Sequence, residues 1–319
     1  MKSFSDVVVR NTKNKGNGVF ALRKFKRGEN VFQIEGPISS ERTIHSIQIG
    51  EFEHITAWKP GMFANHSCNP NCGIKKQNDK VYLCALKTIK SGEEITWDYA
   101  MSDYKFNWFM PCSCGSKNCR KNIGGYIFLD KETRRKYKNF LMSYIKTLEK
   151  KNIFIARAGK TTAYQDRKKR VQGLGVFANK DFKKGEFIFR FRKGKIINRK
   201  DLNKLTKWES NHLDELDGDK FEIVEKPGWL VNHSCDPNAV QKGRSYLALK
   251  KIKKGQEISV DYRTKGIFKN KWKCNCGSKS CKGYVISDFF TLSEKSQKLY
   301  LPYTLKKIKK AYNRIHKQI

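Results

Sequence analysis

The chain has 319 residues, of which 38% are hydrophobic and 12% aromatic, so it can form real hydrophobic cores and wholesale disorder is excluded. Its 67 Lys and Arg against 30 Asp and Glu give a formal charge of +37. Such a charge favours nucleic acid, acidic chromatin faces or anionic membrane surfaces as partners. The alternative explanation is a host whose proteins are all rich in lysine. No run approaches ~18 uncharged apolar residues, so we expect no membrane insertion. Residues 1–10 lack an apolar signal core, so we expect an intracellular, reducing compartment, either nucleus or cytoplasm.

Short strands separated by turns of Gly, Asn and Lys are predicted along the whole chain, so we expect a mostly β fold with minor α content. The predicted strands are residues 7–10, 31–35, 81–86 and 95–97 in the first half, and 153–156, 187–191, 246–249 and 258–260 in the second. Between the halves, Asp130 is typical of a helix N-cap, and the apolar stripe after it predicts one amphipathic helix of about five turns. A more basic helix is expected over 304–319, just after Pro302.

Four motifs occur twice in the chain, in the same order and at a nearly constant spacing of 157 to 167 residues. The pairs are GNGVFA at 16–21 and GLGVFA at 173–178, NHSCNPN at 65–71 and NHSCDPN at 232–238, GEEI with DY at 92–99 and GQEI with DY at 255–262, and C-x-C-x4-C at 112–119 and 274–281. This order and spacing indicate an internal duplication. The predicted organisation is a first domain over 1–129 with a cysteine loop at 112–119, a connecting helix over 130–152, a second domain over 153–288 with a cysteine loop at 274–281, and a basic helical tail over 289–319.

Ten cysteines without a secretion signal indicate metal ligands or reduced thiols rather than disulfides. Each cysteine loop supplies three thiols, one ligand short of a closed tetrahedral zinc site, and each unit has a further cysteine in its NHSC motif. We therefore predict two four-cysteine Zn²⁺ sites, Cys68 with Cys112, Cys114 and Cys119, and Cys235 with Cys274, Cys276 and Cys281. Cys72 and Cys84 remain as ordinary buried thiols, and the alternative for the others is burial without metal.

Together these motifs resemble the SET family of S-adenosylmethionine-dependent protein lysine methyltransferases, and the cysteine loops resemble the family's post-SET zinc loop. The resemblance covers nearly all of both units. It implies two tandem SET domains of the β-clip fold, each with a small post-SET zinc loop, joined by the amphipathic helix. It also implies a protein substrate with a target lysine. A histone tail suits the basic surface, which could also associate non-specifically with nucleic acid.

The resemblance implies the site residues as well. Tyr99 and Tyr262 resemble the catalytic tyrosine, whose hydroxyl orients the methyl donor and the amine. The implied cofactor-binding residues are Gly16, Asn17, Gly18, Asn65 and His66 with Tyr99 in the first unit, and Gly173, Leu174, Gly175, Asn232 and His233 with Tyr262 in the second. The position two before the tyrosine, where the family tunes the number of methyl groups, is Trp97 in one unit and Val260 in the other, so we expect pockets of different size.

Two alternatives remain open from the sequence. One unit could be catalytic while the other is a non-catalytic binding partner. The chain could also be a non-catalytic zinc-containing protein that binds chromatin or nucleic acid, although binding phosphates requires neither a repeated Asp-Tyr nor a repeated Asn-His-Ser-Cys arrangement.

Overall fold

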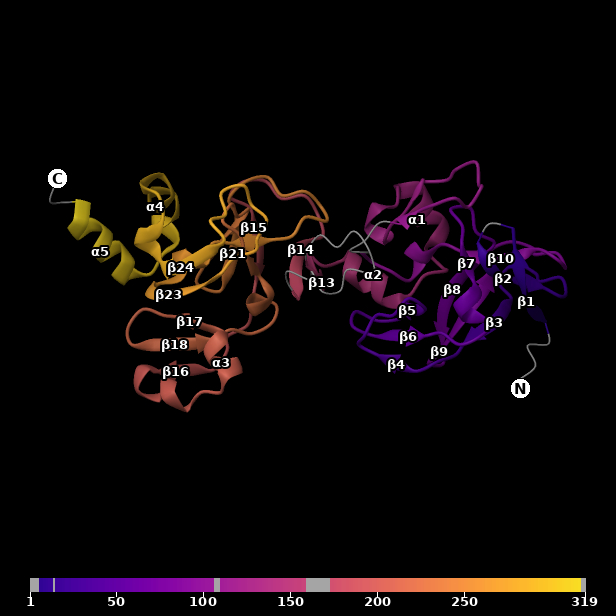
Figure 1. Ribbon diagram of the computed structural model, residues 1–319, viewed down its shortest axis with the longest axis horizontal. Coiled ribbons are helices and arrows are strands. Elements are labelled where there is room, and N and C mark those ends of the chain that lie inside the picture. The colour runs from indigo at the N-terminus through magenta and orange to yellow at the C-terminus, as the bar shows by residue number, and fades with distance from the viewer. Residues whose placement is uncertain (1–5, 14, 106–109, 159–172, 317–319) are drawn as a thin grey trace. The chain divides into compact units, whose positions relative to one another are not determined.

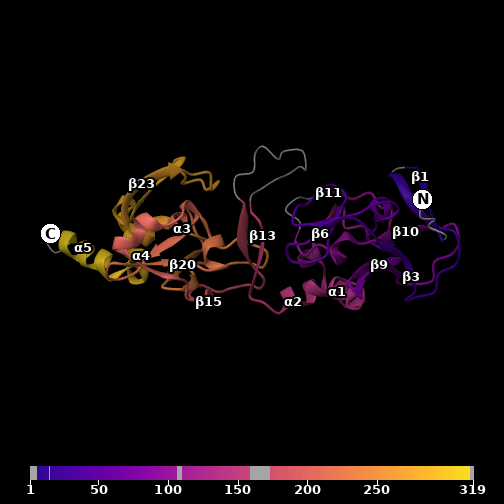
Figure 2. The ribbon, with the colours of Figure 1, turned by 90° about the horizontal axis from the view of Figure 1, so that it is seen from below.

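The computed structural model describes residues 6–13, 15–105, 110–158 and 173–316 (Figure 1, Figure 2). The chain divides into two compact units between Lys151 and Asn152. Strands predominate in both units and the helices are short, which confirms the expected mostly β fold with minor helix. Each of the eight predicted strands overlaps an observed one.

In the first unit a seven-stranded sheet has the order β1-β2-β10-β8-β9-β3, and β7 pairs with β10 beside this path. A small sheet in the order β4-β6-β5 forms an insert between β3 and β7, and β11 pairs with β12 around the cysteine loop. The bounds are β1 Val7–Thr12, β2 Gly16–Ala21, β3 Asn30–Ile34, β4 Ile38–Ser39, β5 Ser46–Gln48, β6 His54–Thr56, β7 Asn65–His66, β8 Cys72–Gln77, β9 Lys80–Ala85, β10 Glu94–Trp97, β11 Met110–Pro111 and β12 Asn122–Ile123.

The segment 130–152 forms two short helices, α1 (Lys131–Tyr137) and α2 (Ser143–Glu149), and not the single helix predicted from its apolar stripe. Asp130 is the N-cap of α1, as expected, and its carboxylate accepts from the Thr133 N–H. The break lies at Phe140, whose carbonyl accepts from the N–H of Ile74 in β8. Because this carbonyl is hydrogen-bonded to the sheet, it does not serve as an acceptor within a continuous helix. A tertiary contact therefore interrupts the helix that the local apolar periodicity predicted.

The second unit repeats this plan with corresponding sheets. β13 pairs with β14, β15-β21-β20 form one sheet, β16-β18-β17 form the insert, β19 pairs with β22 and β23 pairs with β24. The bounds are β13 Ile153–Arg157, β14 Leu174–Ala178, β15 Phe187–Arg190, β16 Ile196–Asn198, α3 Lys207–Asn211, β17 Leu213–Glu215, β18 Lys220–Ile223, β19 Asn232–His233, β20 Ala239–Lys242, β21 Ser245–Ala248, β22 Ser259–Val260, β23 Ile267–Lys273, β24 Tyr284–Asp288, α4 Glu294–Tyr300 and α5 Lys306–His316.

The C-terminal helices pack into the second unit. Ile308 and Tyr312 of α5 are buried with Tyr300 of α4 and Val240 of β20. The segment that was expected to be a basic tail is therefore covered on one face by apolar contacts, and residues 317–319 of the expected helix lie outside the described residues. No helix in the described part of the chain combines the length and the apolar composition needed to cross a membrane.

Candidate active site

The Asn-His segments lie beside the strands that lead to the Asp-Tyr motifs. In the first unit β7 runs parallel to β10, with Asn65 opposite Thr96 and His66 opposite Trp97. In the second unit β19 runs parallel to β22, with Asn232 opposite Ser259. These pairs bring together residues about 30 positions apart in sequence, so the Asn-His and Asp-Tyr motifs lie side by side in both units.

A buried asparagine that the sequence reasoning did not single out fixes this crossing. Asn71 donates to the carbonyl of Glu94 at 2.8 Å and accepts from the N–H of Thr96 at 2.9 Å. Asn238 makes the same two bonds to Glu257 and Ser259, at 2.7 and 2.9 Å. One side-chain amide thus pairs with both a carbonyl and an N–H of the strand, as the backbone of a neighbouring strand would do. Its repetition as the last residue of NHSC-x-P-N was the signal that could have identified it.

The glycine segments lie at the starts of strands, except that Gly173 directly precedes β14. Gly16, Asn17 and Gly18 open β2, and an added Cβ at Gly18 would lie 3.0 Å from Glu94 Oε1 and 3.2 Å from Asn65 Nδ2. At Gly175 the corresponding distances are 2.6 Å to Glu257 Oε1 and 3.0 Å to Asn232 Nδ2. The absent side chain therefore lets the Asn amide approach the strand backbone.

The asparagine amides bond directly to these glycine segments. Asn65 Nδ2 donates to the carbonyl of Asn17 at 3.0 Å, and Asn232 Nδ2 donates to the carbonyl of Leu174 at 3.1 Å. The structure thus groups the Gly, Asn and His residues proposed for the cofactor. Gly16 and Gly173 are exposed, and a Cβ at either would meet no atom within 4 Å.

The two candidate catalytic tyrosines make the same hydrogen bonds to their surroundings. The Tyr99 hydroxyl donates to the carbonyl of Ala64 at 3.2 Å, and its backbone N–H donates to His66 Nδ1 at 3.4 Å. The Tyr262 hydroxyl donates to the carbonyl of Val231 at 2.8 Å, and its N–H donates to His233 Nδ1 at 3.2 Å. Burial raises the pKa of Tyr99 to about 12 and also raises the pKa of Tyr262, so both hydroxyls are protonated at neutral pH.

The histidines are neutral. Burial lowers the pKa of His66 to about 4, although Asp98 acts in the opposite direction. Burial also lowers the pKa of His233. Since Nδ1 accepts from the tyrosine N–H, the ring proton lies on Nε2, which is 3.3 Å from Cys68 Sγ in one unit and 3.3 Å from Cys235 Sγ in the other. The histidine therefore links the tyrosine to the cysteine cluster.

A buried carboxylate precedes each tyrosine, and its cation comes from a different place in each unit. Asp98 is fully buried, and it pairs with Arg120 at 2.8 Å and accepts from the Tyr137 hydroxyl of α1 at 3.0 Å. Asp261 pairs instead with Arg263, only two residues along the chain, at 2.6 Å. Arg120 directly follows the last cysteine of its loop, and none of the repeated sequence motifs includes it.

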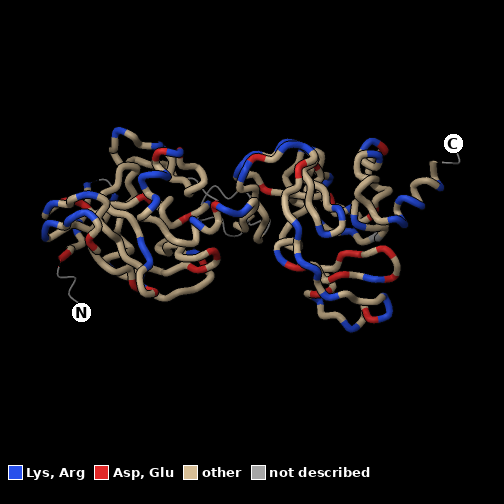
Figure 3. Tube along the Cα trace, turned by 180° about the vertical axis from the view of Figure 1, so that it is seen from behind, with Lys and Arg blue, Asp and Glu red and all other residues tan. Residues whose placement is uncertain are grey.

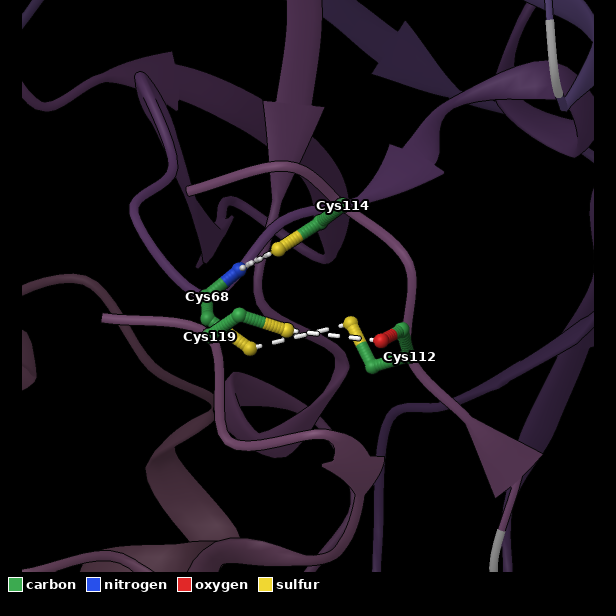
Figure 4. A group of neighbouring side chains, drawn as sticks. All are labelled: Cys68, Cys112, Cys114 and Cys119. Carbon is green, nitrogen blue, oxygen red and sulfur yellow. Dashed lines mark hydrogen bonds between the residues drawn. The ribbon is translucent and has the colours of Figure 1, made fainter. Parts of the chain in front are cut away.

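The four cysteines predicted to bind zinc in the first unit lie together (Figure 4). The sulfur atoms of Cys68, Cys112, Cys114 and Cys119 are all within 4.8 Å of one another. The Sγ atoms of Cys68 and Cys112 are 3.8 Å apart. This equals the edge of about 3.8 Å that a tetrahedron with Zn–S bonds of ~2.3 Å requires. The donor set therefore fits a structural zinc ion.

In the second unit the corresponding group within 4.8 Å contains His233, Cys235, Cys274 and Cys276. His233 thus appears where Cys281 was expected. Cys281 lies next to this group, with its Sγ 3.6 Å from the carbonyl oxygen of Cys274, and Cys119 has the same contact with Cys112 at 3.4 Å.

In both clusters one thiol has a low pKa: burial opposes ionisation, but backbone and side-chain donors lower the pKa of Cys114 to about 6 and that of Cys276 to about 7.

The two units differ at the residue directly before Asp-Tyr. Trp97 is buried, its Nε1 donates to the carbonyl of Ala64 at 3.2 Å, and its ring centre lies 5.0 Å from that of Tyr99. Val260 is also buried but has no such bond to make. The same carbonyl therefore receives two hydrogen bonds in the first unit, and the space beside the tyrosine is filled by an indole there.

Comparison with known proteins decides the family. The family model of the SET domain matches residues 16–100 and 173–263, which together make up more than half of the chain. The chain belongs to the SET domain family. Both matched segments of this SET chain begin at the glycine motif and reach the Asp-Tyr motif.

Several curated relatives are similar to part of the chain. "Histone-lysine N-methyltransferase, H3 lysine-36 specific" of Aspergillus fumigatus is 29% identical over an alignment of 155 residues, which covers 42% of this chain and 16% of that protein. The protein of the same name from Eremothecium gossypii is 32% identical over an alignment of 148 residues, which covers 39% of this chain and 21% of that protein. The chain therefore spans about a fifth or less of the length of these relatives. Among solved structures, KRYPTONITE in complex with mCHG DNA and SAH has a TM-score of 0.33 and 23% identity, covering 37% of this chain and 28% of that one.

Proposed function

We propose that the chain is an S-adenosylmethionine-dependent protein-lysine N-methyltransferase. The observation that carries this proposal is the convergence, in each unit, of a glycine strand, an Asn-His pair and a half-buried tyrosine on one place. Membership of the SET family and relatives named as histone-lysine N-methyltransferases support it. S-adenosylmethionine would supply a methyl group on a sulfonium, the electrophile that a lysine amine needs.

The residues of the chain would act mainly by positioning. The amine lone pair forms the new N–C bond while the S–C bond breaks, so donor, methyl group and amine must lie in line. Tyr99 or Tyr262 would orient the amine, because each hydroxyl is fixed by a main-chain carbonyl and stays protonated. The lysine must be neutral, and an apolar, buried channel favours the neutral amine. Gly18 with Asn65, or Gly175 with Asn232, would hold the cofactor through backbone and amide groups.

We further propose that each unit is a SET domain with a post-SET zinc loop, and that each zinc ion has a structural role. The first four-cysteine group meets the spacing that tetrahedral zinc requires, and the second differs from it in the position of one side chain. In both units the zinc loop would be held against the Asn-His segment, because Cys68 and Cys235 belong to that segment. Zinc would thereby keep His66 and His233 in place.

The proposed substrate is a histone or another chromatin-associated protein, in the nucleus of a host that has one. The relatives named as H3 lysine-36 specific enzymes support this, and so does the charge of +37. Lys and Arg are distributed along the backbone of both units (Figure 3). In the second unit the loops 179–186 and 249–256, which we call the paired basic loops, are joined by a bridge between Phe182 and Ile252. Their exposed lysines would contact the phosphates of DNA.

The test is transfer of radiolabelled methyl from S-adenosylmethionine to histones and to whole-cell lysate, by the wild-type chain and by Tyr99→Phe, Tyr262→Phe and the double variant. Loss of one hydroxyl should lower the rate of its unit about 100-fold, because the amine loses its alignment. Signal lost in one single variant identifies one working unit and makes the other a partner. Signal that disappears only in the double variant indicates two active units. No transfer by a folded, zinc-loaded chain would overturn the proposal and favour the non-catalytic chromatin binder.

A further inference from the structure

Arg120 contacts both the first cysteine group and the Asp-Tyr motif of the same unit. Its backbone N–H donates to Cys68 Sγ at 3.4 Å, and its guanidinium lies 2.8 Å from both carboxylate oxygens of Asp98. The Asp98 side chain is fully buried, and that of Arg120 is 23% exposed. One residue of the cysteine loop therefore connects the cysteine group to the segment that carries Tyr99.

Asp98 in turn fixes the turn that begins with Tyr99. It is the N-cap of the short 3-10 helix Tyr99–Met101, and its Oδ1 accepts from the N–H of Ala100 at 3.1 Å. Its Oδ2 accepts from the Tyr137 hydroxyl at 3.0 Å. A buried carboxylate is stable only while its donors and its cation stay in place, so the position of this turn depends on Arg120. Arg120 thus acts on the candidate catalytic tyrosine through Asp98.

The cysteine loop of the second unit follows the same backbone course at this point. In each loop the first cysteine donates its N–H to the carbonyl two residues after the last cysteine, that of Lys121 at 2.8 Å and that of Gly283 at 2.9 Å. Both of these residues are left-handed, with φ of 61° and 78°. The residue that corresponds to Arg120 is Lys282, and it is exposed. The loops therefore differ here in the side chain and not in the backbone.

Arg263 supplies the cation of the second unit from within the turn itself. It directly follows Tyr262, and its Nε and Nη2 bond to Asp261 at 2.9 and 2.6 Å. Both groups lie in one short segment, so this pair does not depend on where the cysteine loop lies. The residue directly after Tyr99 in the first unit is Ala100, which has no charge to offer.

This difference has a physical consequence when the cysteine loop moves. Ligand binding to a structural metal ion orders the loop, and removal of the ion loosens it. In the first unit that movement takes Arg120 away from Asp98, which leaves an uncompensated buried charge. In the second unit Arg263 stays with Asp261. The contact of 3.3 Å between the histidine and the cysteine group occurs in both units, so it cancels when the two are compared.

We propose that Arg120 is a positioning residue that makes Tyr99 dependent on the zinc loop of its own unit, whereas Arg263 frees Tyr262 from that dependence. As zinc is withdrawn, the first unit should lose its ordered tyrosine segment before the second. This rests on the zinc loops of the proposed function, although it can be measured without methyl transfer.

The test measures hydrogen exchange of the full chain by mass spectrometry, with zinc and after chelation. Peptides covering 96–101 and 259–264 report on the two tyrosine segments. In the wild type, chelation should speed exchange at 96–101 at least about tenfold more than at 259–264, because an unpaired buried charge favours local opening. Lys282→Ala is the matched control at the same place in the second loop. It should leave both segments as in the wild type, because this side chain is exposed.

Moving the cation tests Arg120 directly. Arg120→Ala combined with Ala100→Arg gives the first unit the arrangement of the second, so chelation should then affect 96–101 no more than 259–264. Arg120→Ala alone should speed exchange at 96–101 even while the chain keeps both zinc ions.

The reverse exchange is made as well, because Ala100 is fully buried and its substitution could unfold the first unit. Arg263→Ala combined with Lys282→Arg should make exchange at 259–264 sensitive to chelation, at least about tenfold more than in the wild type. Exchange at 259–264 that is as insensitive to chelation as in the wild type would contradict the role of the cation.

Methyl transfer separates this proposal from the proposed function. In the zinc-loaded Tyr262→Phe chain, Arg120→Ala should lower kcat about tenfold with little change in KM for the protein substrate, because alignment and not binding is lost. The expected exchange pattern in a chain that transfers no methyl group would support the role of Arg120 and contradict the activity. Equal effects of chelation on the two segments, in a chain that transfers methyl groups, would overturn the role and leave the activity standing. A chain that transfers methyl groups without binding zinc would overturn the role together with the zinc loops.

Discussion

The amide of Asn65 lies 2.9 Å from Glu94 Oε1, and the same pair recurs as Asn232 and Glu257 at 2.8 Å. Each asparagine belongs to the Asn-His motif. Glu94 opens β10, and Glu257 lies two residues before β22, so each glutamate comes shortly before Asp-Tyr. The glutamate thus sets the side-chain position of a proposed cofactor ligand. Lys15 pairs with Glu94 at 2.8 Å, which further fixes the carboxylate in the first unit.

Gly175→Ala should distort this arrangement in the second unit. The new Cβ would lie 2.6 Å from Glu257 Oε1 and 3.1 Å from the Ala158 Cβ, so overpacking should lower the free energy of unfolding by about 1–3 kcal/mol. We expect binding of S-adenosylmethionine to that unit to weaken about tenfold or more, measured by calorimetry. Gly173→Ala is the matched variant for stability, because its Cβ meets nothing within 4 Å. Equal melting temperatures for the two variants would contradict the argument.

Arg120→Gln should be strongly destabilising for the first unit. It leaves the fully buried Asp98 without its cation, and removing one partner of a buried pair costs about 3–5 kcal/mol. Arg120 is 23% exposed, so we expect about 3 kcal/mol, visible as a lower melting temperature of this unit. Arg23→Gln is the control: its pairs with Asp6 and Glu29 are exposed to solvent, so the melting temperature should change little. A similar loss in both variants would show that burial does not govern this ion pair.

Zinc content should follow the cysteine groups. Mass spectrometry of the native chain should find two zinc ions, and Cys112→Ser or Cys274→Ser should each leave one. Cys72→Ala is the control that should retain both, because Cys72 is in neither group. Chelation should lower the melting temperature of both units. A chain that binds no zinc when it is folded in excess zinc would refute the assignment.

The fourth ligand in the second unit can be identified by two further variants. The contacts of Cys281 match those of Cys119: each has its Sγ close to the carbonyl oxygen of the first cysteine of its loop, and each accepts from a backbone N–H at 3.4 Å two residues later. We therefore expect Cys281→Ser to lose the second zinc ion and His233→Asn to retain it while weakening cofactor binding. The reverse result would make His233 the ligand.

DNA binding should depend on the paired basic loops. Lys183, Lys184, Lys251 and Lys253 are exposed and have no ion pair among the described residues. Changing all four to Gln should weaken binding to duplex DNA at least tenfold. The slope of log K against the logarithm of the salt concentration should become less steep by about 0.9 for each phosphate contact that is lost. Changing Lys200, Lys207, Lys220 and Lys295 to Gln alters the net charge equally at exposed positions elsewhere in the unit. Equal effects of the two sets would attribute DNA binding to net charge alone.

Most of the candidate site could be read from the sequence, because the duplication repeats whole motifs. The Asn-His pairs, the tyrosines and the first four-cysteine group are found together as expected. Local patterns were less reliable where a distant contact intervenes. The helix predicted over 130–152 is broken at Phe140, because the Phe140 carbonyl accepts a hydrogen bond from β8. The apolar periodicity within the segment carries no information about this contact with a distant strand.

The order and spacing of the motifs are enough to predict the family, the two units and the residue types of the sites. The cation that neutralises each buried carboxylate depends instead on the folded chain: Arg120 reaches Asp98 from the cysteine loop, whereas Arg263 reaches Asp261 from two residues away. The same holds for Asp214 and Glu222, which lie opposite each other across β17–β18 and pair with Lys265 and Arg244. The reason is physical. Burial and ion pairing depend on distances between segments that are remote in the chain, and those distances exist only after folding.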